Sequence, residues 1–114
     1  MSNQETVLQN QIRLAISSPN VRMFRNNVGA YKNDDGRLVE YGLGKGSSDL
    51  VGFVVREITP DMVGKSVAVF TAIEIKTAKG RLSDTQQAFI NMVRNKGGLA
   101  GVARSIEDAK EMLK

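Results

Sequence analysis

The 114-residue sequence contains no cysteine, no histidine and no tryptophan. Without cysteine, the chain can form no disulfide, no zinc–thiolate site, no iron–sulfur cluster and no thiol nucleophile. Without histidine, a Ser-His-Asp triad and all other histidine acid–base chemistry are excluded. An enzyme of this composition must therefore work with carboxylates, lysine, hydroxyls, amides or a metal ion held by oxygen ligands.

Long apolar runs and a signal-like N-terminus are also missing from the sequence. The longest apolar run, around residues 67–75, is too short to cross a bilayer. We therefore expect a cytoplasmic protein with no membrane partner. The length predicts a single domain over residues 1–114. Lysine and arginine number 16 against 12 acidic residues, and the net charge of +4 favours a polyanionic partner.

Apolar residues at helical spacing predict three helices, over residues 2–17, 83–95 and 106–113. Two of these helices begin with the spacing of a capping box. Ser2 precedes Glu5 by three residues, and Ser83 precedes Gln86 by the same interval. These cap residues fix where the first and second helices are expected to start.

Period-two patterns and turn signals predict five strands, over residues 21–28, 37–41, 50–58, 67–77 and 99–103. Residues 67–77 give the strongest pattern, because both faces are apolar over the first half of the segment. This pattern is typical of a central strand that is covered on both sides. A glycine-rich loop over residues 42–48 precedes the third strand. The mixture of elements predicts an α/β domain with α+β layers.

Glu74 and Lys76 place opposite charges on one face at the end of the strongest strand. They could neutralise each other or lie in water. However, Asp49 begins the preceding strand, and antiparallel pairing could bring it close to Glu74. Two adjacent carboxylates repel unless a cation lies between them, and Mg²⁺ or Mn²⁺ would suit them together with the Ile75 carbonyl and waters. Lys76 could then orient or deprotonate a metal-bound water.

The pattern Asp49…Glu74-Ile75-Lys76 resembles the PD-(D/E)xK nuclease motif, with Ser48 in place of the proline. More of the chain resembles the VRR-NUC (virus-type replication-repair nuclease) family, and in particular its small stand-alone phage-type members. The resembling blocks are FRNNVG (24–29), KGSSDLVG (45–52), AIEIKT (72–77), LSDTQQAFI (82–90) and GGLAGVARSIEDA (97–109). The opening helix, with Glu5, Leu8 and Gln9, is similar to the E-x-x-(I/L)-Q of the family.

This resemblance implies a restriction-endonuclease-like core of order αβββαβα, with a central mixed sheet flanked by helices. It implies an Mg²⁺- or Mn²⁺-dependent DNA endonuclease that acts as a homodimer on branched DNA such as four-way (Holliday) junctions, in a bacterial or phage-infected cell. Asp49 and Glu74 would be metal ligands and Lys76 a catalytic residue. Gln86 would be the catalytic helix glutamine, and Glu5 an accessory acid that could reach the metal. The last two residues are equally well explained by helix capping.

Basic, amide and hydroxyl side chains flank the predicted site and could contact DNA phosphates. These candidates are Arg25, Asn26, Asn27, Lys32, Lys45, Ser47, Ser48, Lys79 and Arg81. For each lysine or arginine alone, a solvated surface charge is the competing interpretation. Three other functions remain open: a non-catalytic nucleic-acid-binding module with a nuclease-like fold, a structural or interaction domain, and a nuclease that acts on flap or linear DNA.

Overall fold

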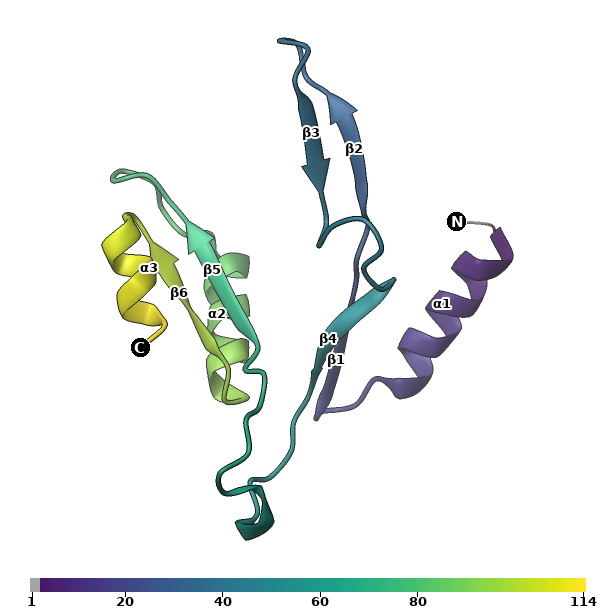
Figure 1. Ribbon diagram of the computed structural model, residues 1–114, viewed down its shortest axis with the longest axis vertical. Helices are drawn as coiled ribbons and strands as arrows, with labels where there is room; N and C mark the ends of the chain where they lie inside the picture. Colours follow the sequence, from purple (N-terminus) through teal and green to yellow (C-terminus); the bar gives the residue numbers. More distant parts are fainter. Residues whose placement is uncertain (1–2) are drawn as a thin grey trace. The chain divides into compact units, whose positions relative to one another are not determined.

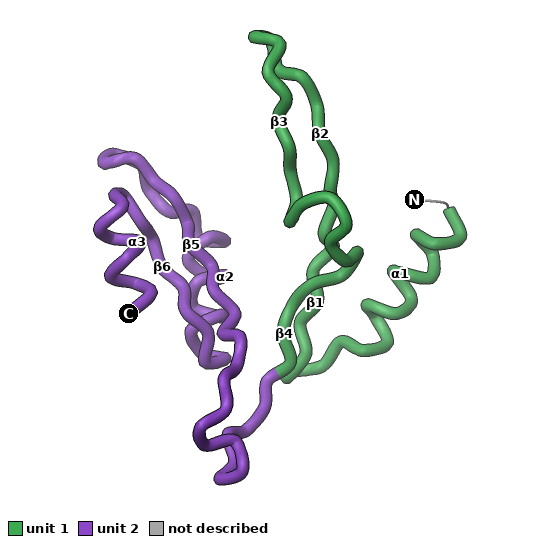
Figure 2. Tube along the Cα trace, viewed as in Figure 1, with its two compact units in different colours: residues 1–54 green, residues 55–114 purple. Residues whose placement is uncertain are grey.

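The computed structural model describes residues 3–114 and consists of two compact units, Met1–Val54 (unit 1) and Val55–Lys114 (unit 2) (Figure 2). The elements along the chain are α1 (Asn3–Ile16), β1 (Val21–Arg25), β2 (Gly29–Lys32), β3 (Leu38–Tyr41), β4 (Leu50–Val54), the 3₁₀ turn η1 (Pro60–Met62), β5 (Thr71–Ile75), α2 (Asp84–Asn95), β6 (Leu99–Ala103) and α3 (Ile106–Met112) (Figure 1). All three predicted helices are confirmed. The Ser2 half of the first capping box lies outside the described residues.

In unit 1, β1 and β4 pair antiparallel, with Val21 opposite Val54 and Arg25 opposite Leu50. Gly52 lies at the closest approach of these two strands. A Cβ atom on Gly52 would lie 1.9 Å from the carbonyl oxygen of Arg22, so a side chain at this position would force the strands apart. The second pair of the unit, β2 and β3, forms an antiparallel hairpin.

The strand predicted over residues 21–28 is wrong beyond Arg25, because β1 ends there and a separate strand, β2, begins at Gly29. The side chain of Asn26 explains the interruption. Its Nδ2 donates to Ser47 Oγ and to the Ser48 carbonyl oxygen, each at 2.8 Å, and its Oδ1 accepts from the Leu43 amide at 3.0 Å. Asn26 thereby fixes the glycine-rich loop beside the end of β1.

In unit 2, β5 and β6 pair in parallel, with Thr71 opposite Leu99 and Ile75 opposite Ala103. Helix α2 packs on one face of this pair. The buried residues of the resulting core are Ile90, Val93 and Ala100, and the partly buried ones around them are Phe70, Ala72, Leu82, Phe89, Met92 and Val102. Because Ala72 and Glu74 alternate with outward residues, they lie on the face of β5 that α2 covers.

The prediction that the strand over residues 67–77 is covered on both sides is wrong. The observed strand begins at Thr71, and on its second face Ile73 is 37% exposed and Ile75 is 71% exposed. The apolar pattern identifies which residues share a face, but it carries no information about what covers that face.

The described strands form three two-stranded sheets, β1–β4, β2–β3 and β5–β6, where the sequence predicted one central sheet. Five strands precede α2, compared with four predicted from the residue patterns and three in the order that the family resemblance implies. The antiparallel pairing expected between the strands of Asp49 and Glu74 is not among these pairs, because β4 pairs with β1 and β5 pairs with β6. The mixed α/β class of the prediction is confirmed.

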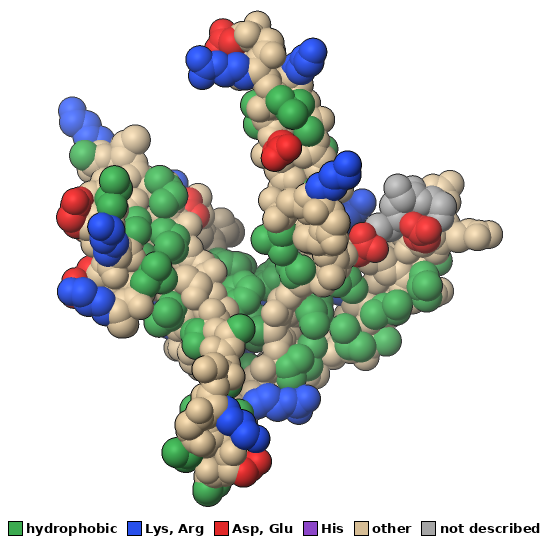
Figure 3. Space-filling model, viewed as in Figure 1, with side chains coloured by type: hydrophobic (Ala, Val, Ile, Leu, Met, Phe, Trp, Pro, Cys, Tyr) green, Lys and Arg blue, Asp and Glu red, His purple; other side chains and the backbone are tan. Residues whose placement is uncertain are grey.

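Helix α1 has an unusual distribution of burial, since its only buried residue among those described is Gln9. Its large apolar side chains stay exposed and gather along the helix in the space-filling view (Figure 3). They are Val7, Leu8, Ile12, Leu14 and Ile16. No helix within residues 3–114 has the length and apolar character that crossing a membrane requires.

Candidate active site

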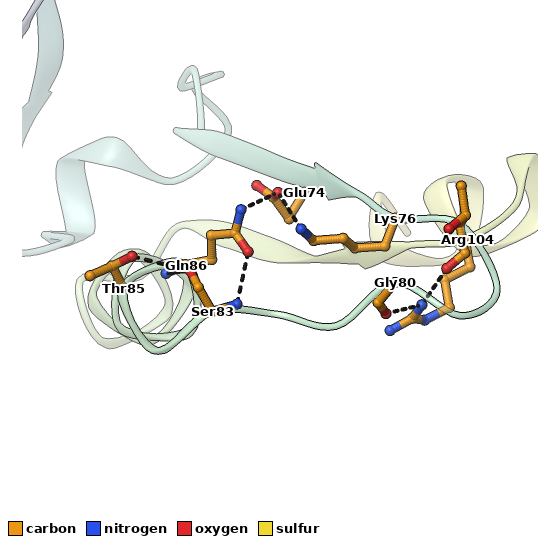
Figure 4. Close-up of polar contacts among 8 residues, drawn as sticks. Glu74, Lys76, Gly80, Ser83, Thr85, Gln86 and Arg104 are labelled. Atoms are coloured by element: carbon orange, nitrogen blue, oxygen red, sulfur yellow. Dashed lines mark hydrogen bonds and ion pairs between the residues drawn. The ribbon is translucent and has the colours of Figure 1, made fainter.

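Glu74 lies near the end of β5, where the first turn of α2 approaches the strand. Gln86 Nε2 donates a hydrogen bond to Glu74 Oε1 at 2.9 Å, and Lys76 Nζ lies 3.6 Å from the same oxygen (Figure 4). The side chains of Glu74 and Lys76 are 34% and 20% exposed, so the pair is partly shielded from water. Within residues 3–114 no hydrogen bond or ion pair engages Oε2, which leaves that oxygen available as a ligand.

The capping box predicted at the start of α2 is confirmed, and it sets the orientation of the Gln86 amide. The backbone N–H of Ser83 donates to the side-chain oxygen Oε1 of Gln86 at 2.9 Å, while Ser83 Oγ accepts from the backbone N–H of Gln86 at 3.1 Å. A backbone N–H can only donate, so Oε1 must face Ser83 and Nε2 must face Glu74. Gln86 therefore caps the helix and contacts Glu74 at the same time, although the sequence presented these roles as alternatives.

A cavity of about 360 Å³ lies beside this pair, with Ala72, Glu74, Gln86 and Phe89 among its lining residues. A carboxylate at the edge of such a space is an oxygen ligand of the kind that Mg²⁺ and Mn²⁺ take. No cluster of three or more acidic side chains able to hold a metal occurs within residues 3–114. Glu74 supplies the one carboxylate among the residues that line this cavity.

The loop after β5 is held by Arg104, which the sequence analysis missed. Arg104 Nη1 donates to the carbonyl oxygens of Thr77 at 2.5 Å and Gly80 at 2.7 Å (Figure 4). This loop carries Lys79 and Arg81, both exposed. No local sequence pattern could have identified Arg104, because its contacts are made across 24 and 27 residues. The clamp fixes the loop that presents two of the predicted DNA-binding cations.

Asp49 directly precedes β4 in unit 1, and its side chain is exposed. Its backbone carbonyl accepts a hydrogen bond from the backbone N–H of Asn26 at 2.8 Å. The carboxylate forms no ion pair with another side chain of the described part of the chain. Asp49 is thus placed by its backbone, and its carboxylate stays available.

The other predicted site residues of unit 1 divide into two groups. Arg25, Asn27 and Lys45 are exposed, as a phosphate-contacting role requires. The side chains of Asn26 and Ser47 are instead bonded within the loop, where Ser47 Oγ donates to the Gly44 carbonyl at 2.6 Å.

The remaining predicted residues lie at element ends. Glu5 is in the first turn of α1, Ser48 is exposed beside Asp49, Lys32 ends β2, and Ile75 ends β5 next to Glu74. The structure thus brings Glu74, Lys76 and Gln86 together within unit 2. It places Asp49 and the loop residues within unit 1.

The sequence profile of the VRR-NUC domain matches residues 8–107. The chain belongs to the VRR-NUC family. The matched segment contains Asp49, Glu74, Lys76 and Gln86, whereas Glu5 lies before it. Searches of the curated proteins and of the solved structures gave no match. A VRR-NUC domain implies a nuclease-type function in DNA processing, with DNA as the substrate.

Proposed function

We propose that this VRR-NUC domain is a metal-dependent DNA endonuclease that hydrolyses phosphodiester bonds. The observation that carries the proposal is the arrangement around Glu74. Its Oε1 is held by Gln86 and Lys76, and its Oε2 has no hydrogen-bond or ion-pair partner among the described residues. A carboxylate that is oriented in this way, with a lysine beside it, suits the binding of a cation next to a phosphate.

Glu74 would hold Mg²⁺ or Mn²⁺ through its carboxylate, and the Ile75 carbonyl is a second oxygen on the same strand. When bound, such a cation supplies charge that polarises a phosphate oxygen. Lys76 adds a positive charge at the same place and would orient the attacking water or contact the scissile phosphate. Gln86 would keep Glu74 in its orientation during this chemistry, because its own amide is fixed by Ser83.

Asp49 is proposed as the second carboxylate ligand on the strength of the sequence motif and the family match, which includes it. Glu5 is proposed as an accessory acid on the motif alone, because the match begins after it. For Asp49 the available carboxylate is consistent with this role.

DNA contacts are proposed for two groups of exposed residues. Lys79 and Arg81 lie on the loop that Arg104 clamps, so they are presented from a fixed backbone. In unit 1, Arg25 is paired with Leu50 at the start of β4 and Asn27 follows β1, while Lys45 and Ser48 belong to the loop before β4. Lysine and arginine in such positions neutralise phosphates without reading bases, which suits recognition by DNA structure more than by sequence.

The preferred substrate is proposed to be branched DNA such as a four-way junction, cut by a homodimer. A two-fold dimer would carry two symmetric active sites, and these could make two symmetric cuts. The alternatives are a nuclease acting on flap or linear DNA and a binding module without catalysis. Family membership supports the nuclease step. The junction substrate and the homodimer rest on the sequence resemblance.

The test is cleavage of labelled four-way junction, flap and linear duplex DNA by the whole protein, in Mg²⁺, in Mn²⁺ and in chelator. Glu74→Gln is compared with Glu107→Gln, which makes the same chemical change on exposed α3. We expect symmetric, metal-dependent cuts in the junction that Glu74→Gln abolishes and Glu107→Gln retains. Binding without cleavage of any substrate by folded wild-type protein would favour the binding module instead.

A further inference from the structure

Unit 1 contains a polar cavity of about 280 Å³ beside Asp49. Its lining includes Thr6 and Gln9 from α1, Arg25 and Asn26 at the end of β1, and Ser47 and Asp49 from the segment directly before β4. The function proposed above uses Asp49 alone from this cavity wall as a metal ligand. The residues of α1 that line the cavity have no role assigned in it.

Gln9 is 8% exposed and is the only buried polar residue within residues 3–114. Its Nε2 donates to the Asp49 carbonyl oxygen over a long distance of 3.5 Å. Its Oε1 is buried and accepts no hydrogen bond from the described part of the chain. Exchanging the two atoms would set Oε1 against a carbonyl oxygen, so the amide orientation is fixed by chemistry.

A buried acceptor without a donor is rare in folded proteins and costs stability. Such a group is explained when an ordered water or a ligand supplies the missing donor. The terminal amide of glutamine rotates about a soft torsion, so a small rotation can turn Oε1 toward a donor that enters the cavity. The structure therefore places Gln9, with its unused acceptor, and Asp49 among the residues that line the same cavity.

The two unused groups on this wall, Gln9 Oε1 and the Asp49 carboxylate, both accept hydrogen bonds or cations. A phosphate offers only further acceptors, so it would leave Gln9 Oε1 unsatisfied. A hydrated divalent cation suits both groups, because a carboxylate binds the ion and its polarised waters are strong donors.

We propose that Gln9 is a positioning residue of the Asp49 metal site. Its Oε1 accepts a hydrogen bond from the hydration shell of a divalent cation held by Asp49, while its Nε2 steadies the Asp49 carbonyl. This inference rests on the proposed function, since it requires that Asp49 binds a metal. Through Gln9, the one buried side chain among its described residues, helix α1 would contribute to metal binding.

The test measures two properties of the whole protein: the melting temperature without metal, and the Mn²⁺ dissociation constant from the electron paramagnetic resonance of free Mn²⁺. Gln9→Leu removes the buried acceptor and keeps an apolar body of similar size. Gln11→Leu makes the same change at an exposed position of the same helix and serves as the control.

We expect Gln9→Leu to weaken Mn²⁺ binding about tenfold, in the range typical of outer-shell partners of a metal. We also expect its metal-free melting temperature to be unchanged or raised. The variant loses an unsatisfied acceptor, and the Asp49 carbonyl keeps the hydrogen bond from the Asn26 amide. Gln11→Leu should change neither property.

A lowered melting temperature with unchanged Mn²⁺ affinity would show that Gln9 is purely structural and would overturn the inference. If Gln9→Leu does not fold, Gln9→Met repeats the test with an unbranched side chain of similar length. Failure of both to fold would also assign Gln9 a structural role. If the wild-type protein binds no Mn²⁺, the metal step of the proposed function fails. Wild-type binding with an unaffected Gln9→Leu variant contradicts only the inference about Gln9.

Discussion

The carboxylates of Glu74 and Asp49 have very different support in the structure. In unit 2, Glu74 Oε1 accepts a hydrogen bond from Gln86 and forms an ion pair with Lys76. The Gln86 side chain is itself held by the Ser83 backbone at the cap of α2. In unit 1, Asp49 is held through its backbone carbonyl, and a buried acceptor stands beside it unused. Glu74 is oriented before any ligand arrives, whereas the surroundings of Asp49 would be completed by one.

Neutralising either carboxylate tests whether both serve one reaction despite this difference. Asp49→Asn and Glu74→Gln should each lower the rate of junction cleavage about a thousandfold, because each removes charge that the proposed cation requires. The measurement is single-turnover cleavage in Mg²⁺, with Glu107→Gln as the control. Full activity in Asp49→Asn would remove Asp49 from the site and leave Glu74 as the only carboxylate supported.

Gln86→Glu changes the hydrogen bond that orients Glu74 and leaves the surroundings of Asp49 as they are. The capping box accepts glutamate at this position, so α2 should stay as stable as in the wild type. The second carboxylate oxygen would then face Glu74 in place of a donor and repel it. We expect metal affinity to fall by roughly ten- to a hundredfold, because Glu74 leaves its orientation, and the same repulsion to lower the metal-free melting temperature slightly. An unchanged metal affinity would contradict a role for Gln86 beyond capping.

Gly52→Ala tests the support of Asp49 through the strand that follows it. The added Cβ would lie 1.9 Å from the Arg22 carbonyl oxygen, so β1 and β4 must separate. We expect a loss of about 1–3 kcal/mol in the free energy of unfolding, measured by urea denaturation. Gly36→Ala is a useful comparison, because the added Cβ would have no atom within 4 Å. The stability lost in this variant would come only from the positive φ of 79° at Gly36. Equal stability of wild type and Gly52→Ala would disprove the close approach.

Ser83→Pro and Ser83→Gly separate the two functions of the α2 cap. Both lose the hydroxyl, but only proline loses the N–H that holds Gln86 Oε1. The Ser83 φ of −75° is compatible with proline. We expect Mn²⁺ to bind several-fold more weakly to Ser83→Pro than to Ser83→Gly. Equal affinities would show that the backbone donor does not orient Gln86 for the site.

The sequence predicts the C-terminal part of the fold well, because its features are local. The cap at Ser83 and the stripe of α2 fix that helix, and the strand over residues 99–103 is confirmed at both ends as β6. The sequence does not predict the break after Arg25, because it depends on an Asn26 side chain that bonds to residues 17 to 22 positions away. Such contacts leave no trace in periodicity.

In the candidate site too, local contacts could be predicted from the sequence and contacts between distant residues could not. Glu74, Lys76 and Gln86, which the sequence named as site residues, lie in contact, since two of them are at the end of one strand and the third is in the first turn of the next helix. Their role in a site stays a prediction. The burial of Gln9 was not predicted. A polar residue beside the exposed apolar residues of α1 gives no periodic signal, and only the packing of unit 1 reveals it.

The most direct test of the account is the position of bound Mn²⁺, mapped by paramagnetic broadening of backbone amide signals in the ¹⁵N-labelled protein. If Glu74 and Asp49 hold the metal, substoichiometric Mn²⁺ broadens the signals of Asp49, Glu74 and Lys76 first, and Glu74→Gln reduces this broadening. Broadening confined to other acidic segments, such as the turn at Asp34 and Asp35, would contradict the proposal that Glu74 and Asp49 hold the metal.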